Sequence, residues 1–410
     1  MTISFGLDTD KWGQKISEVI LKTRLQGLGE KKTTAVFPKL IFLHRDEICG
    51  HKGTPNYYLK KLGIKCSSIM LYPDWLSIDS GYQKEVYDEC GKTVTPMGCR
   101  AFLGKFYHPN TGELIFDGRA NIGAVTLNLP LYALESKGDI KKFYELIDKY
   151  AKMVFDIHMD SYERIGKAKG STNPLFYCEG GAWKTVGYDE CIAPVLEGFT
   201  ASLGFIGLEE TCQALFGKTL MDCIDFGTEV VQYLWDLTVK YKEKYGKLFT
   251  LYATPGESLI ERFQKINRER FGTEGEALKR GYMTNSFHQG VWIDHIAPEK
   301  MLLEKPMFDI SQGGRITYCE YPYGVDLDVL EQNINFAMSL GLYSGVNIES
   351  ATCQDCGERG EFEICPNCAS DNVTSVNRCC GYLSFSKVKG QSRYNDGKKE
   401  EIRDRVDHIK

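Results

Sequence analysis

A buried β-strand is predicted at Val36-Phe37-Pro38-Lys39-Leu40-Ile41-Phe42-Leu43, which is apolar apart from one lysine. Similar apolar runs occur at residues 124–129 and 248–252. Between these runs, apolar residues recur at helical spacing, which predicts helices at residues 12–27, 139–166, 223–245, 256–270 and 326–340. Because strands and helices alternate, we expect an α/β fold.

The composition is that of an ordinary globular protein. The 410 residues are 42% hydrophobic and 26% charged, and this length suggests more than one structural unit. A net charge of -5 argues against a broad basic surface for nucleic acid, so we expect no nucleic-acid partner. The sequence has neither a membrane-length apolar run nor a signal-like start, so we expect no membrane partner and a cytoplasmic location.

A cysteine cluster near the C-terminal end predicts a metal site. Two C-x-x-C turns, Cys353/Cys356 and Cys365/Cys368, supply four thiolates, which suit a closed tetrahedral zinc site with a structural role. An iron–sulfur cluster also uses four thiolates and is the alternative. The chain has 15 cysteines, an odd number spread along the sequence, which favours reduced thiols over a disulfide scaffold.

Two turns are candidates for a reactive thiol and for phosphate binding. Cys99 lies in the loop-forming segment Pro96-Met97-Gly98-Cys99-Arg100, although a single loop cysteine is more often inert. Thr254, Pro255, Gly256, Glu257 and Ser258 lie between a predicted strand and a predicted helix. Free N–H groups at the start of that helix predict a phosphate cradle, and the alternative is an ordinary helix cap.

Several segments, taken together and in order, resemble the catalytic subunit of class III anaerobic ribonucleoside-triphosphate reductases, which are glycyl-radical enzymes. The resemblance runs from about residue 3 to the C-terminus, with the four-cysteine cluster before the last segment. The segments are Thr33-Thr34-Ala35-Val36-Phe37-Pro38-Lys39-Leu40, Thr95-Pro96-Met97-Gly98-Cys99-Arg100, Asp117-Gly118-Arg119, Leu127-Asn128-Leu129-Pro130, Gly207-Leu208-Glu209-Glu210-Thr211, Asn285-Ser286-Phe287-His288 and Arg378-Cys379-Cys380-Gly381-Tyr382-Leu383.

The resemblance assigns roles to individual residues. It implies that Gly381 stores the radical and that Cys99 becomes the thiyl radical at the tip of a finger loop. Gly397 is the rival glycine, but its Asp-Gly context is typical of a turn. Asn121 would position substrate and formate, and residues 254–258 would bind the substrate phosphates.

The resemblance also implies an architecture. Residues 1–345 would form the second half of a ten-stranded α/β barrel, with the finger loop near residues 96–104. Residues 346–372 would form the zinc-binding module, and residues 373–410 the glycyl-radical loop and a C-terminal helix.

The implied activity is reduction of ribonucleoside triphosphates to 2′-deoxyribonucleoside triphosphates, with formate as reductant; a thioredoxin-like protein is the alternative. A separate activating enzyme would use S-adenosylmethionine and an iron–sulfur cluster to form the glycyl radical. A strand at the very start, Ile3–Gly6, and the lack of upstream family motifs suggest one subunit of a split enzyme.

In a split enzyme, an N-terminal polypeptide would complete the barrel, and the assembly would be a homodimer or heterotetramer. Self-association of a naturally short enzyme is the alternative. Two further interpretations are a non-catalytic glycyl-radical spare or regulatory subunit, and a free-standing zinc-binding interaction protein.

Overall fold

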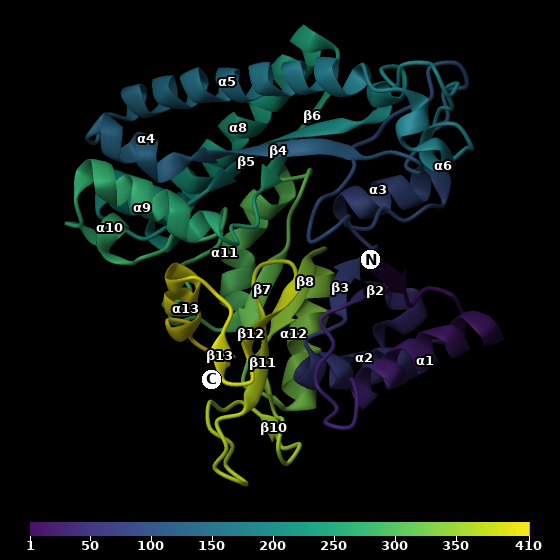
Figure 1. Ribbon diagram of the computed structural model, residues 1–410, viewed down its shortest axis with the longest axis vertical. Helices are drawn as coiled ribbons and strands as arrows, with labels where there is room; N and C mark the ends of the chain where they lie inside the picture. The colour runs from purple at the N-terminus through teal and green to yellow at the C-terminus, as the bar shows by residue number, and fades with distance from the viewer. Residues whose placement is uncertain (410) are drawn as a thin grey trace.

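Two β-sheets form the centre of the molecule, which is described for residues 1–409 by a computed structural model (Figure 1). The larger sheet has the order β1-β2-β3-β8-β7, in which only the β3–β8 pair is antiparallel. Its strands are β1 (Thr2–Phe5), β2 (Lys39–His44), β3 (Asp74–Ser77), β7 (Thr317–Glu320) and β8 (Tyr343–Asn347). The smaller sheet is parallel and has the order β4-β5-β6, with β4 (Asn121–Asn128), β5 (Thr200–Ile206) and β6 (Leu248–Ala253).

The segment that leads into β7 joins these two sheets. Gly313 N donates to Leu251 O, and Ala253 N donates to Gly314 O, both at 2.9 Å, so this segment continues the strand order beyond β6. Within residues 1–409, β1 and β4 each pair with one strand only, and the layer is not closed into a barrel. Half of a ten-stranded barrel would have five strands, whereas the two central sheets hold five strands and three strands.

A third, antiparallel sheet carries the C-terminal part of the chain. Its order is β10-β9-β11-β12-β13, with β9 (Ser350–Cys353), β10 (Arg359–Gly360), β11 (Val373–Arg378), β12 (Leu383–Val388) and β13 (Gln391–Ser392). Because β9 pairs with β11, this sheet crosses the boundary expected between residues 372 and 373. The cysteine cluster and the turn that contains Gly381 therefore belong to one sheet.

Helices cover the outer faces of the two central sheets (Figure 1). The long helices α5 and α8 pack along the smaller sheet, and α12 packs against the larger one. Helix α2 also contacts the larger sheet, where Trp75 of β3 lies against Gly63 and Ser67. The α-helices are α1 (Lys11–Gln26), α2 (Tyr57–Met70), α3 (Gly81–Cys90), α4 (Leu129–Ser136), α5 (Ile140–Gly166), α6 (Pro174–Tyr177), α7 (Leu208–Phe216), α8 (Ile224–Tyr245), α9 (Leu259–Phe271), α10 (Glu276–Lys279), α11 (Ala297–Ile310), α12 (Leu327–Ser339) and α13 (Asp396–Arg403). Shorter turns are η1 (Asp46–Gly50), η2 (Gly170–Thr172), η3 (Val195–Gly198) and η4 (Met221–Cys223).

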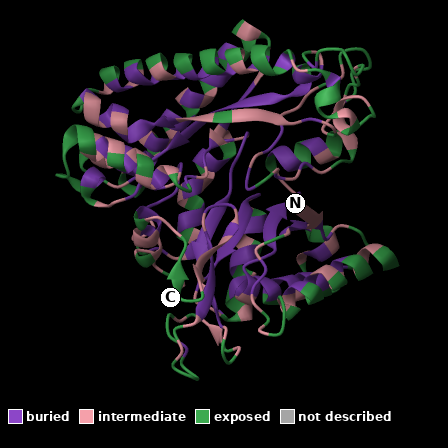
Figure 2. Ribbon diagram, in the orientation of Figure 1, coloured by how far each residue is buried: buried purple, intermediate pink, exposed green. Residues whose placement is uncertain are grey.

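The local sequence explains these elements. Every residue of β2 and β5 is buried, as expected for parallel strands covered on both faces (Figure 2). Helix α5 begins where the side chain of Asp139 accepts a hydrogen bond from Lys142 N, and one face of the helix is buried. No helix in residues 1–409 combines the length and apolar character needed to cross a bilayer.

The α/β fold class predicted from the sequence is confirmed. The strands expected at residues 124–129 and 248–252 are β4 and β6, and four of the five expected helices begin and end within two residues of the prediction. The fifth, α9, begins at Leu259 and not at residue 256, because Pro255 and the positive φ of Glu257 (29°) form a turn first.

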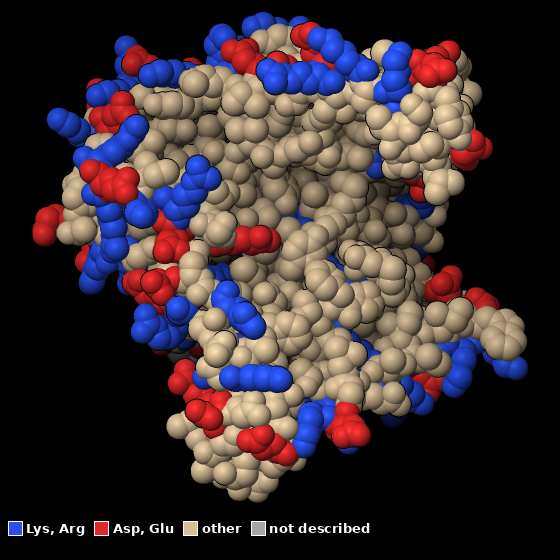
Figure 3. Space-filling view, viewed as in Figure 1, with Lys and Arg blue, Asp and Glu red and all other residues tan. Residues whose placement is uncertain are grey.

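One face of the molecule is hollowed between the two central sheets (Figure 3). Lysine, arginine, aspartate and glutamate gather mainly at the rim of this face, and the hollow is lined mostly by other residues. A hollow with few charged residues, beside two unpaired strand edges, resembles the interior of an incomplete barrel.

We expect Trp75→Ala to destabilise the larger sheet. Trp75 is fully buried, its ring centroid lies 4.8 Å from that of Phe42, and its indole N–H donates to Ser67 Oγ at 3.2 Å. The free energy of unfolding should fall by about 3–5 kcal/mol in denaturant titrations. Trp12→Ala is the control, because Trp12 is 70% exposed and should cost no more than about 0.5 kcal/mol. Equal losses in the two variants would contradict this packing.

Candidate active site and metal centre

Gly381 and Cys99 lie in direct contact, although they come from segments far apart in the sequence. Cys99 is at the tip of a loop closed by Met97 and Ala101, whose backbones exchange hydrogen bonds of 2.7 and 3.2 Å. Gly381 lies in the turn between β11 and β12. A Cβ atom on Gly381 would lie 2.3 Å from the Cβ of Cys99, closer than two carbon atoms that are not bonded to each other can approach. The contact therefore requires glycine at residue 381.

A buried lysine connects the same two residues. Lys39, the first residue of β2, donates from Nζ to the carbonyl oxygens of Cys99 (2.6 Å) and Gly381 (2.9 Å). Its ammonium group also lies 3.1 Å from Asp74 Oδ2, and neither side chain is exposed. One cation thus contacts the backbone on both sides of the glycine–cysteine contact.

Asp74 connects this lysine to the base of the glycine turn. Arg378, the last residue of β11, donates to Asp74 Oδ1 at 2.7 Å and also to the carbonyl oxygen of Val346 at 3.1 Å. The hydroxyl of Tyr343 donates to Asp74 Oδ2 at 3.0 Å. Because these groups are buried, each depends on its partners to replace the hydrogen bonds of water.

The thiol of Cys99 lies among groups that keep it protonated. A hydrogen bond with the Cys380 thiol and burial raise the pKa of Cys99 well above its ordinary value. Burial chiefly raises the pKa of Cys380 to about 12. The hydroxyl of Tyr252, in β6, lies 3.8 Å from the Cys99 sulfur. At neutral pH, Cys99 therefore presents an S–H group.

The turn at residues 254–258 lies against the glycine turn. Glu257 accepts a hydrogen bond from the Cys380 thiol at 3.0 Å. Gly256 N donates to the side chain of Asn285, and the Thr254 hydroxyl lies 3.0 Å from that of Thr126. Ser258 is the N-cap of α9 but makes no side-chain cap, so its hydroxyl does not satisfy the N–H groups at the start of that helix.

Asn121 begins β4, in the same sheet as Tyr252 but two strands away. Its amide donates to Ser202 Oγ at 2.7 Å, and its side-chain oxygen accepts from Gly123 N at 2.8 Å. The structure thus fixes the Asn121 side chain against β5.

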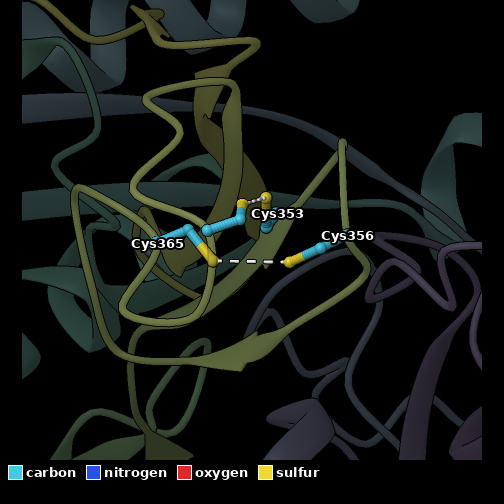
Figure 4. Close-up of side chains that lie close together, drawn as sticks. Cys353, Cys356 and Cys365 are labelled. Atoms are coloured by element: carbon cyan, nitrogen blue, oxygen red, sulfur yellow. Dashed lines mark hydrogen bonds between the residues drawn. The ribbon is translucent and has the colours of Figure 1, made fainter.

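The four cysteines of the cluster converge on one point (Figure 4). All four sulfur atoms lie within 4.8 Å of one another, and the Cys353–Cys368 and Cys356–Cys365 pairs are 3.6 and 3.5 Å apart. Four thiolates about 2.3 Å from a tetrahedral ion would be ~3.8 Å apart. The donor set and spacing therefore fit a closed four-thiolate metal site, such as zinc.

The metal centre and Gly381 lie at opposite ends of one hairpin. Cys353 pairs with Val373 at the start of β11, and Gly381 follows the end of that strand. A strand of six residues spans about 20 Å, so the metal is too far away to take part in chemistry at Gly381. Its geometry suits a structural role at the base of the hairpin.

Three of the predicted sites thus meet: Gly381, Cys99 and the turn at residues 254–258. The rival Gly397 is in α13, where a Cβ would contact Glu261 (2.8 Å) and not Cys99. No sequence motif indicated a role for Lys39, Asp74, Cys380 or Tyr252. The one available signal was a lysine inside an otherwise apolar strand, because a buried cation needs a partner.

Comparisons with known proteins identify relatives along the whole chain. The family model described as anaerobic ribonucleoside-triphosphate reductase matches residues 1–408. The enzyme of that name from Escherichia coli (strain K12) is 37% identical over 425 aligned positions, which cover all of this chain and 58% of that protein. The enzyme of the same name from enterobacteria phage T4 is 34% identical, with coverage of 100% and 68%.

Solved structures support the fold. An anaerobic ribonucleotide reductase superposes with a TM-score of 0.69 and 16% identity, over 96% of this chain and 57% of that one. The anaerobic ribonucleotide reductase from Thermotoga maritima, with glycerol in its active site, gives 0.62 and 17%, with coverage of 91% and 55%. The chain thus spans a little more than half the length of most of these relatives.

We expect Cys353→Ser to abolish metal binding. Serine removes one of four thiolates, and its hydroxyl is a poor ligand at neutral pH, so elemental analysis should find metal falling from about one ion per chain to nearly none. Cys191→Ser is the control, because Cys191 is an exposed thiol outside the cluster, and it should keep the metal. A wild-type chain that takes up no metal when supplied with Zn²⁺ would contradict the assignment.

Proposed function

This chain belongs to the anaerobic ribonucleoside-triphosphate reductase family, and we propose that it contributes the radical-bearing part of an enzyme that reduces ribonucleoside triphosphates. The observation that carries the proposal is the contact between Gly381 and Cys99. A residue that stores a radical and the thiol that receives it must lie close enough for direct transfer of a hydrogen atom between them. The chain holds such a pair in a buried site.

We propose that Gly381 stores the radical and that Cys99 performs the substrate chemistry. The Cα radical of Gly381 takes the hydrogen atom of the Cys99 S–H group, which restores glycine and leaves a thiyl radical. This step needs a protonated thiol, and the raised pKa of Cys99 provides one at neutral pH. The thiyl radical then takes the 3′ hydrogen of the ribose and returns it at the end of the cycle.

The substrate would lie between Cys99 and the turn at residues 254–258. Backbone N–H groups at the start of α9 suit the phosphates, and Asn121 would orient the ribose and the reductant. The 2′ hydroxyl leaves as water. Formate supplies two electrons and a hydrogen and leaves as carbon dioxide, so the sum is ribonucleotide, formate and a proton giving deoxyribonucleotide, carbon dioxide and water.

We propose zinc as the metal of the four-cysteine cluster. A closed four-thiolate site has no open position for substrate, and zinc has no redox chemistry to interfere with a radical. Bound at the base of the β11–β12 hairpin, it would fix the strand that carries Gly381.

Two protein partners follow from this function. A radical-generating enzyme with S-adenosylmethionine and an iron–sulfur cluster would take the first hydrogen from Gly381. A further polypeptide would supply the strands that pair with β1 and β4. Support for the latter comes from an exposed apolar surface beside β1. Trp12 (70% exposed), Ile16 (60%) and Val19 (47%) follow one face of α1. Val19 lines a groove with Ile3 of β1 and Phe37 (55%).

Activation should produce an unpaired electron on Gly381. After anaerobic reaction of the assembled reductase with its activating enzyme, electron paramagnetic resonance should show a doublet from the one remaining α-hydrogen. Gly381→Ala should lose the signal, because the methyl group would collide with Cys99. Gly104→Ala should keep it, because a Cβ at Gly104 meets no atom within 4 Å.

The Cys99→Ala variant tests whether radical storage on Gly381 and the substrate reaction at Cys99 are separate steps. It should keep the doublet and lose turnover, because the radical still forms but no thiol passes it to the substrate. Turnover by Cys99→Ala would refute the thiyl assignment, and a doublet in Gly381→Ala would refute the choice of glycine.

Trp12→Glu should weaken assembly with the polypeptide that completes the sheet. A charge in the apolar surface beside β1 would have to be desolvated in the interface, so association in a 1:1 mixture should weaken at least about tenfold. Leu302→Glu is the control, because Leu302 is 53% exposed in α11, which packs against β7 at the opposite end of the larger sheet from β1. Analytical ultracentrifugation would measure both. A Trp12→Glu chain that assembles like wild type would exclude this surface as the interface.

A further inference from the structure

We propose that Lys39 is a positioning residue that sets the separation of the radical glycine and the reactive thiol by binding both of their carbonyl oxygens with one ammonium group. The inference rests on the proposed function, since it concerns the same pair of residues. It adds a residue from the first strand pair of the larger sheet to a site otherwise formed by the finger loop and the glycine turn.

The hydrogen bonds of Lys39 match the valence of an ammonium group. A charged lysine has three N–H donors, and Nζ has three oxygen neighbours at 2.6, 2.9 and 3.1 Å: the carbonyls of Cys99 and Gly381 and the carboxylate of Asp74. A neutral amine has only two N–H groups and could not donate to all three oxygens. The geometry therefore suits the charged form, although burial lowers the pKa of Lys39.

The charge of Lys39 is not needed to neutralise Asp74. Arg378 already donates to both carboxylate oxygens of Asp74, at 2.7 and 3.5 Å. With Lys39 added, the three buried groups carry one excess positive charge. Burial of an uncompensated cation is costly, and here the two carbonyl dipoles are what stabilise it. The excess charge is therefore directed at the backbone of Cys99 and Gly381.

This arrangement has two effects on the radical pair. First, both backbones are bound to the same nitrogen, so neither can move away without losing a charge-assisted hydrogen bond. Hydrogen transfer over a fixed short distance gains rate from such orientation. Second, a glycyl radical is delocalised onto its carbonyl oxygen, and an ammonium group on that oxygen changes how the unpaired spin is shared with Cα.

Aromatic rings restrict Lys39 to this position. Its ammonium group lies 5.3 Å from the ring centroid of Tyr343 and 5.9 Å from that of Tyr382, within or at the edge of cation–π distance. Tyr382 follows Gly381 directly, so the glycine turn encloses the same cation from a second direction. The hydroxyl of Tyr343 also donates to the Cys99 carbonyl oxygen at 3.5 Å, so Tyr343 contacts one of the same oxygens as Lys39.

The test compares Lys39→Met with Lys60→Met in the assembled, activated reductase. Lys60 is an equally buried lysine that donates to one carbonyl, that of Gly50, away from the site. Lys39→Met should lower turnover per radical at least tenfold and alter the α-hydrogen splitting of the doublet. Lys60→Met should leave both unchanged, even where both variants lose stability. Equal turnover per radical and equal splitting in the two variants would overturn the proposal.

A second measurement does not need the radical. In the unactivated assembly, hydrogen–deuterium exchange should become faster at residues 97–101 and 379–383 in Lys39→Met but not in Lys60→Met. Lys39→Gln keeps two N–H donors without the charge and should give intermediate exchange and turnover. Unchanged exchange in both loops of Lys39→Met would overturn the proposal.

These outcomes distinguish the proposed function from the role of Lys39. A wild-type assembly that gives no doublet at Gly381 would refute the proposed function. A wild-type doublet and turnover, with Lys39→Met indistinguishable from Lys60→Met, would refute the role of Lys39 alone.

Discussion

A single buried carboxylate, Asp74, connects the elements from which the site is built. It binds Lys39 at the start of β2 and Arg378 at the end of β11, and it accepts the hydroxyl of Tyr343 from β8. Breaking such a buried ion pair typically costs about 3–5 kcal/mol, because the partner is left charged without water. The position of the glycine turn against the larger sheet therefore depends on this group.

The glycine at residue 381 is required by space and not by backbone conformation. Gly381 is absent from the positions with positive φ, whereas Gly98 in the finger loop has a φ of 57°. The two glycines thus serve different purposes: Gly98 allows the loop to turn, and Gly381 allows the backbone to approach Cys99. The four-cysteine cluster lies at the far end of the same hairpin.

Much of the fold could be predicted from the sequence because it follows from local patterns. Helix α5 and strand β6 have periodicities that a short window contains, and both were placed within two residues. The four-cysteine cluster could also be predicted from the sequence, because the C-x-x-C spacing is itself typical of a metal site. The role of Lys39 could not be predicted, because its partners Cys99 and Gly381 lie 60 and 342 residues away. The third sheet was missed for a similar reason: its short strands pair across the cysteine loops.

The long sequence separation of these contacts has a consequence for biosynthesis. Lys39 and Asp74 emerge from the ribosome well before their partners, because Arg378 follows Asp74 by 304 residues and Gly381 follows Lys39 by 342. Strands β7 and β8, which complete the larger sheet, come shortly before these partners in the chain. Until the partners follow, the two charges remain hydrated. Closing so long a loop is slow, and domains fold as their residues become available. The centre therefore forms only after translation has passed the cysteine cluster.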